Sequence, residues 1–91
     1  MPRISNEALH QAVEHLNEVA GLSSTIGFRL DPGPMGRVRL MSPSGQAVIG
    51  VPTPFGMGSM PRSEFIRAVE YFTAGVVYVR RPTSGIDKQA L

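Results

Sequence analysis

Three arginines are the residues of this sequence whose type and spacing point to binding chemistry. Arg29 lies in the segment GFRL, and Arg37 and Arg39 lie in the segment GRVRL beyond a Pro/Gly-rich turn. Guanidinium groups make bidentate contacts with carboxylates and phosphates. Because alternate residues of a strand point to the same side of a sheet, the three side chains are predicted to share one exposed face. We interpret them as a binding patch for an acidic protein surface or a phosphate backbone.

Phe55 and Met57 form a second candidate contact. They belong to the segment FGMGSM, residues 55–60, where glycines separate large apolar side chains. Methionine adapts to irregular surfaces, and loops of this kind often serve recognition. Because prolines and glycines break both helix and sheet, we expect residues 52–59 to be an irregular loop with Met57 as the most exposed side chain. The alternative is that Phe55 and Met60 pack back over the sheet edge or against the start of the following helix.

The residue types needed for catalysis or metal binding are scattered rather than grouped. The chain has no cysteine, which removes disulfides, thiolate zinc sites and thiol nucleophiles. His10 and His15 are separated by about 140° around a helix, so one metal ion cannot use both from that helix alone. His10 and Glu14 have i, i+4 spacing but supply only half of a metal site. We therefore predict a non-enzymatic protein with no cofactor and no metal.

Length and charge favour one domain with a protein partner. The 91 residues carry a formal charge of +2, and of nine basic residues only Lys88 is not arginine. A strong nucleic-acid binder usually has a larger basic excess. No apolar run approaches the roughly 18 residues of a membrane span, and the start of the chain lacks the apolar core of a signal peptide. We expect a single domain over residues 1–81, a flexible C-terminal tail over 82–91, a cytoplasmic location and no membrane contact. A homodimer is compatible with the sequence.

Two helices are predicted to position these side chains. Apolar residues at helical spacing indicate a first helix between a Ser5 or Asn6 cap and a stop at Gly21. A second helix is indicated over residues 61–75, with a proline in its first turn. The β-branched segment 76–81 is either a short fourth strand or a continuation of that helix.

Alternating apolar residues predict three strands, over residues 25–30, 37–41 and 46–51. On the third strand the pattern permits two registers, with either Ile49 or Val48 facing the core. The order of elements predicts an α+β fold. It is a two-layer α-β-β-β-α sandwich, in which both helices cover one face of an antiparallel three-stranded sheet.

The apolar residues also predict a register for the first two strands. If they are all buried on one face, Leu30 pairs with Val38, and Arg29 then lies directly opposite Arg39. Like charges in that position repel each other in the free protein. An anionic group that bridges the two guanidiniums would relieve the repulsion.

Three segments within residues 3–75 resemble one group of proteins. They are RISNEALHQAVEHLNEVAG, GRVRLMSPSG and MPRSEFIRAVEYFTAG, and they are similar to segments of small uncharacterised accessory proteins encoded by bacteriophages and prophages. The resemblance implies a phage origin and a shared fold. It also implies an accessory protein that binds and inhibits a host factor or a defence complex, for example of the CRISPR type, in the cytoplasm of the host bacterium.

A second comparison concerns topology. The predicted order of helices and strands is also that of double-stranded RNA-binding domains, which place a dense lysine cluster at the start of the second helix. This chain has only Arg62 and Arg67 there, and their spacing puts them on different helix faces. We therefore predict a protein that binds a partner protein. The alternative is a small nucleic-acid-binding regulator that uses the arginine-bearing sheet face.

Overall fold

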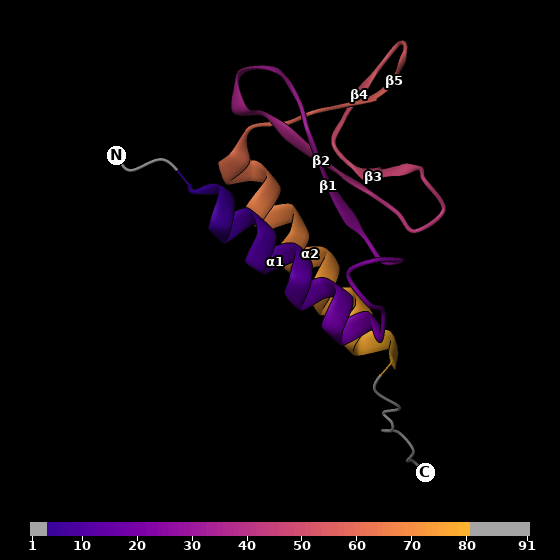
Figure 1. Cartoon of the computed structure of the whole chain (residues 1–91). Coiled ribbons are helices and arrows are strands. Elements are labelled where there is room, and N and C mark those ends of the chain that lie inside the picture. The colour runs from indigo at the N-terminus through magenta and orange to yellow at the C-terminus, as the bar shows by residue number, and fades with distance from the viewer. Residues whose placement is uncertain (1–3, 81–91) are drawn as a thin grey trace.

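The structure, a computed structural model, describes residues 4–80. Within this range a helix is followed by a three-stranded sheet, a small hairpin and a second helix (Figure 1). The elements are α1 (Asn6–Ala20), β1 (Arg29–Pro32), the 3-10 turn η1 (Pro34–Gly36), β2 (Val38–Met41), β3 (Ala47–Ile49), β4 (Val51–Thr53), β5 (Gly56–Gly58) and α2 (Arg62–Arg80). The tail predicted at 82–91 lies outside the described residues.

Both helices lie on one face of an antiparallel sheet with the strand order β1-β2-β3. α1 and α2 run side by side in the same direction (Figure 1), and the guanidinium of Arg62 at the start of α2 donates a hydrogen bond to the side chain of Asn6 at the start of α1. The largest fully buried side chains come from both layers: Phe65, Leu9, Leu16, Leu40 and Val69. The predicted α+β fold class is confirmed.

α1 begins and ends at the signals in its sequence. The Ser5 hydroxyl accepts a hydrogen bond of 3.1 Å from a backbone N–H of the first turn, and Gly21 adopts the left-handed conformation with a φ of 75°. Both are common helix caps. Between them, Leu9, Val13 and Leu16 recur at helical spacing and are buried, so one face of α1 supplies about half of the core.

α2 is longer than the predicted second helix. The described part of segment 76–81 is helical up to Arg80, so the reading of this segment as a fourth strand is wrong. Val76 follows Phe72 by one turn and, like it, packs against the core. A continued helix satisfies its own backbone hydrogen bonds, whereas a strand there would need a free sheet edge. Gly75 does not end the helix, because its φ is not positive.

The register of β1 with β2 differs from the predicted one by two residues. Leu30 lies opposite Leu40 instead of Val38. The turn decides this step, because the N–H of Gly33 donates to the carbonyl of Arg37 at 2.7 Å. That closing pair leaves only η1 for the turn, a loop length common in hairpins. A shift of two residues keeps every side chain on its predicted face, since strand faces alternate with a period of two.

Two separate segments fill the third position of the sheet. β3 pairs with one half of β2, and Met60 pairs with Val38 at the other half through backbone hydrogen bonds of 3.0 and 2.7 Å. A bulge in β3 leaves Val48 exposed and Ile49 buried, which decides between the two predicted registers in favour of an inward Ile49. Residues 50–59, between β3 and Met60, leave the sheet as a projection that we call the arm.

The arm corrects the prediction of an irregular loop at residues 52–59. β4 and β5 pair as an antiparallel hairpin within it. Pro52 is accommodated because proline is tolerated on edge strands, where its missing N–H would face solvent. At the turn, Thr53 Oγ1 accepts a hydrogen bond from the N–H of Phe55 (3.1 Å) and donates one to the carbonyl of Gly56 (2.5 Å). The prolines and glycines of this segment therefore shape a hairpin.

Asn17 joins the end of α1 to the start of the sheet. Its side chain is 4% exposed; it donates to the carbonyl of Phe28 (3.1 Å) and accepts from the N–H of the same residue (2.7 Å). Gly27 has no room for a side chain, because a Cβ there would collide with Asn17 Oδ1. The Asn17 amide thus satisfies the backbone beside the outer edge of β1, where no further strand pairs.

Candidate interaction surface

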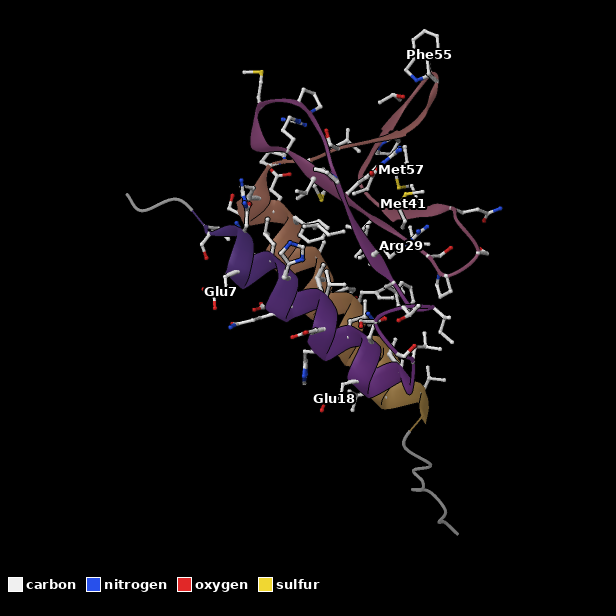
Figure 2. The ribbon with its side chains drawn as sticks, in the orientation of Figure 1. Glu7, Glu18, Arg29, Met41, Phe55 and Met57 are labelled. Atoms are coloured by element: carbon white, nitrogen blue, oxygen red, sulfur yellow. The ribbon has the colours of Figure 1, made fainter. Side chains whose placement is uncertain are left out.

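The sheet face away from the helices carries the predicted arginine patch. We call this surface the open face and define it by the side chains of Arg29, Asp31, Arg39 and Met41. Figure 2 shows Arg29 and Met41 on one side of the molecule, and Glu7 and Glu18 on the outer surface of α1 on the other. The fold therefore separates the acidic helix from the arginine-bearing sheet.

Arg39 is held by two contacts. Its Nε donates to Oδ2 of Asp31 at 2.5 Å, and its Nη1 donates to the carbonyl of Met57 in the arm, also at 2.5 Å. Asp31 lies directly opposite Arg39 in the sheet, so the predicted cross-strand pair of Arg29 with Arg39 is wrong. The two-residue change of register replaces a like-charge pair by an ion pair, and Arg39 becomes a link between the sheet and the arm.

Arg37 holds the base of the arm. Its Nη2 donates to the carbonyl of Ser59, the last residue of the arm, at 2.9 Å. Ser59 also lies tightly against the β1–β2 turn, since a Cβ added at Gly33 would stand 2.6 Å from its Oγ. Two of the three predicted patch arginines, Arg37 and Arg39, thus contact carbonyl groups of the same ten-residue arm.

Arg29 is the arginine of the open face that remains free. It is exposed, lies opposite Met41, and its guanidinium has no hydrogen-bond or ion-pair partner among the described residues. A guanidinium has five N–H donors, so Arg37 and Arg39 also keep donors that their internal contacts do not use. All three can contribute to binding, and Arg29 can do so without breaking an existing contact.

Phe55 is the exposed residue of the arm. It lies at the tip of the hairpin, is 98% exposed and points away from the rest of the molecule (Figure 2). Met57, predicted to be the most exposed, is half-buried. Met60 packs against the core, so the predicted alternative holds for Met60 but not for Phe55. The side chain that the sequence leaves ambiguous is the one most open to a partner.

The arm is fitted closely to the sheet. A Cβ added at Gly50, where the arm leaves β3, would collide with the carbonyl of Gly58 and stand 2.7 Å from Cγ of Met57. Only a glycine allows the two backbones to approach so closely. Together with the contacts of Arg37 and Arg39, this approach fixes the direction in which the tip of the arm projects.

Met35 is an exposed apolar residue that the sequence analysis missed. It lies in η1, is 94% exposed and has a φ of 58°, a conformation uncommon for residues other than glycine. The β1–β2 turn and the tip of the arm both project at the upper end of Figure 1. The signal that marks Met35 is its place in the run PGPMG, where prolines and glycines leave it as the only large side chain.

The other residues considered for chemistry lie apart from this surface or are already engaged. His10 and Glu14 are exposed on α1. Across the part of the chain that the structure describes, no group of three or more His, Asp or Glu residues is placed to hold a metal ion. Arg62 is turned toward Asn6 of α1. In the same described part, neither helix combines the length and the apolar character that crossing a membrane requires.

The tip of the arm and the open face form one candidate interaction surface. It offers the apolar side chain of Phe55, the free guanidinium of Arg29 and the spare donors of Arg37 and Arg39. This combination suits an apolar pocket bordered by acidic groups. Comparison of the chain with protein-family models, with curated proteins and with solved structures finds no match.

Proposed function

We propose that the protein is a non-enzymatic interaction protein that binds a partner protein through the tip of the arm and the open face. The observation that carries the proposal is the 98% exposure of Phe55 on a hairpin that is tied to the sheet. A side chain so exposed gains nothing from folding and places apolar surface in water. Aromatic residues and arginines dominate the binding energy of protein interfaces, and this surface presents both.

The contacts at the base of the arm support a preformed anchor. Arg39 bonds the carbonyl of Met57, and Arg37 bonds the carbonyl of Ser59. A segment that is ordered before binding loses less conformational freedom in the complex, and the affinity rises accordingly. The two arginines therefore contribute to binding first by holding Phe55 in place.

A protein partner accounts for this surface better than a nucleic acid does. Binding to a phosphate backbone draws its affinity from several cationic side chains that neutralise phosphates. On the open face, Asp31 pairs with Arg39 and Arg37 is engaged by the arm, which leaves Arg29 as the fully available cation. We infer a partner with an apolar pocket for Phe55 and acidic groups beside it.

The resemblance to phage accessory proteins supports a partner of one kind. Such a protein would bind a host factor or a component of a defence complex, for example of the CRISPR type, in the cytoplasm of the host bacterium. It would inhibit that partner by covering a surface the partner needs. This role requires shape and charge complementarity but no reaction, which agrees with a surface built from an apolar tip and arginines.

Site-specific photocrosslinking tests the proposal. A photoreactive phenylalanine analogue replaces Phe55 in the full chain, and a matched control carries the analogue at Glu18, which is exposed on the opposite side of the molecule. In a susceptible bacterium we expect a protein crosslinked from position 55 and not from position 18, identified by mass spectrometry. Equal crosslinking from both positions, or none from position 55, would overturn the proposal.

Salt dependence separates the protein partner from the nucleic-acid alternative. The affinity for the captured partner is measured from about 50 to about 200 mM salt, a range over which phosphate contacts by several arginines lose affinity steeply. An apolar anchor with charges at its rim should lose less. A steep log-linear loss, with nucleic acid present in the crosslinked complex, would favour the small nucleic-acid-binding regulator instead.

A further inference from the structure

The outer side of α2 carries apolar side chains that no described residue covers. Tyr71, Tyr78 and Val79 are 86%, 79% and 79% exposed, and Gly75 lies among them at helical spacing. We call these four residues the α2 stripe. No residue from 71 to 79 is charged, so the stripe offers an apolar contact without electrostatic attraction for a phosphate backbone.

Gly75 has no role inside the described fold that requires a glycine. Its φ is not positive, and no atom beyond its own helix backbone and chain neighbours lies within 4 Å of the position of an added Cβ. A glycine in a helix interior is nonetheless destabilising relative to alanine. A second helix packed across this point would explain it, because the distance between packed helices depends on the size of the side chains at the contact.

The area of the stripe matches the lower limit for a specific dimer. A buried aromatic side chain removes about 150–250 Å² from water, so covering Tyr71 and Tyr78 in two copies buries about 600 Å² or more. Val79, together with the exposed parts of the neighbouring Phe72 and Val76, brings the total to roughly 1,000 Å², the size at which a biological interface becomes credible.

We propose that the α2 stripe is a homodimer interface that packs α2 of one chain against α2 of a second copy. A two-fold axis at Gly75 would place Tyr71 of each copy opposite Val79 of the other, since both lie four residues from Gly75. Each contact then occurs twice, as an isologous interface requires. The glycines at the axis let the helices approach, and a large side chain on each meets a smaller one.

The tyrosines make this interface directly measurable. Tyr71 and Tyr78 are the two tyrosines of the chain, which has no tryptophan, so tyrosine fluorescence reports on the α2 stripe alone. The full chain is studied by sedimentation equilibrium over a wide range of protein concentration, with acrylamide quenching of the fluorescence at each concentration. We expect a monomer–dimer equilibrium, and quenching that becomes weaker as the dimer forms.

Gly75→Leu isolates the packing at the axis. The open space around Gly75 accommodates the larger side chain in the monomer, and leucine is the better helix former, so the melting temperature of the monomer should not fall. The dissociation constant of the dimer should rise about tenfold or more. As the matched control, Gln11→Leu adds the same side chain at an exposed position of α1 and should leave the dissociation constant unchanged.

Three results would overturn the proposal. A monomer at every concentration with fully quenchable tyrosines would show that the stripe is uncovered. Tyrosines shielded to the same extent at every concentration would show that another part of the same chain covers it. A dimer that Gly75→Leu leaves intact would place the interface elsewhere. The binding surface for the partner is separate, so Phe55→Ser should not change the sedimentation, and either proposal can fail without the other.

Discussion

Replacing Arg39 with methionine removes the two contacts that link the sheet to the arm. The substitution keeps a long apolar stem but deletes the donors to the Asp31 carboxylate and the Met57 carbonyl. Arg29→Met is the matched control, because it makes the same change on the same face at a residue with no partner in the described range. The structure therefore predicts different outcomes for two arginines that the sequence treats alike.

The size of the effect follows from the exposure of the groups. The side chains of Arg39 and Asp31 are 34% and 36% exposed, so their ion pair contributes about 0.5–1 kcal/mol. The part-buried bond to the Met57 carbonyl contributes about 1 kcal/mol more. Arg39→Met should lower the free energy of unfolding by about 1.5–2 kcal/mol and the melting temperature by roughly 6–12 °C. Arg29→Met should change it by about 0.5 kcal/mol or less.

Thermal and urea unfolding, followed by circular dichroism, measure the stability of both variants. Hydrogen exchange of the β4 and β5 amides reports on the arm itself, and it should become faster in Arg39→Met but not in Arg29→Met. A double-mutant cycle with Asp31→Asn separates the share of the ion pair. Equal stability of the two arginine variants, or unchanged exchange in the arm of Arg39→Met, would refute this account of the clamp.

The remaining predictions concern the packing and the anchor. Asn17→Ala should lower the free energy of unfolding by about 2–4 kcal/mol in urea, because both backbone groups of Phe28 lose a buried partner; a loss below about 1 kcal/mol would contradict this role. Gly50→Ala should cost about 2 kcal/mol or more through its collision with β5, whereas Gly75→Ala, in open space, should raise stability by about 0.5–1 kcal/mol. Phe55→Ser should leave the melting temperature within about 4 °C, but should weaken binding of the crosslinked partner about tenfold or more; unchanged binding would exclude the tip of the arm.

Much of the candidate site was predictable in composition but not in state. Arg29, Arg37 and Arg39 lie on the side that strand alternation predicts, and Phe55 is exposed. Which guanidiniums are free, however, depends on where the arm returns to the sheet. The predicted exposure of Met57 failed for the same reason, since its burial follows from the contact between the arm and β3.

The sequence by itself determined the helix caps at Ser5 and Gly21, the apolar faces of both helices and the face of each strand residue. These properties depend on neighbours within a few positions, through the helical and strand periods. Only the tertiary structure decided the register of β1 with β2, the arm at 50–59 and the continuation of α2 through Gly75. An apolar alternation is unchanged by a shift of two residues, so the register is selected by the turn and by the long-range hydrogen bonds that can be satisfied together.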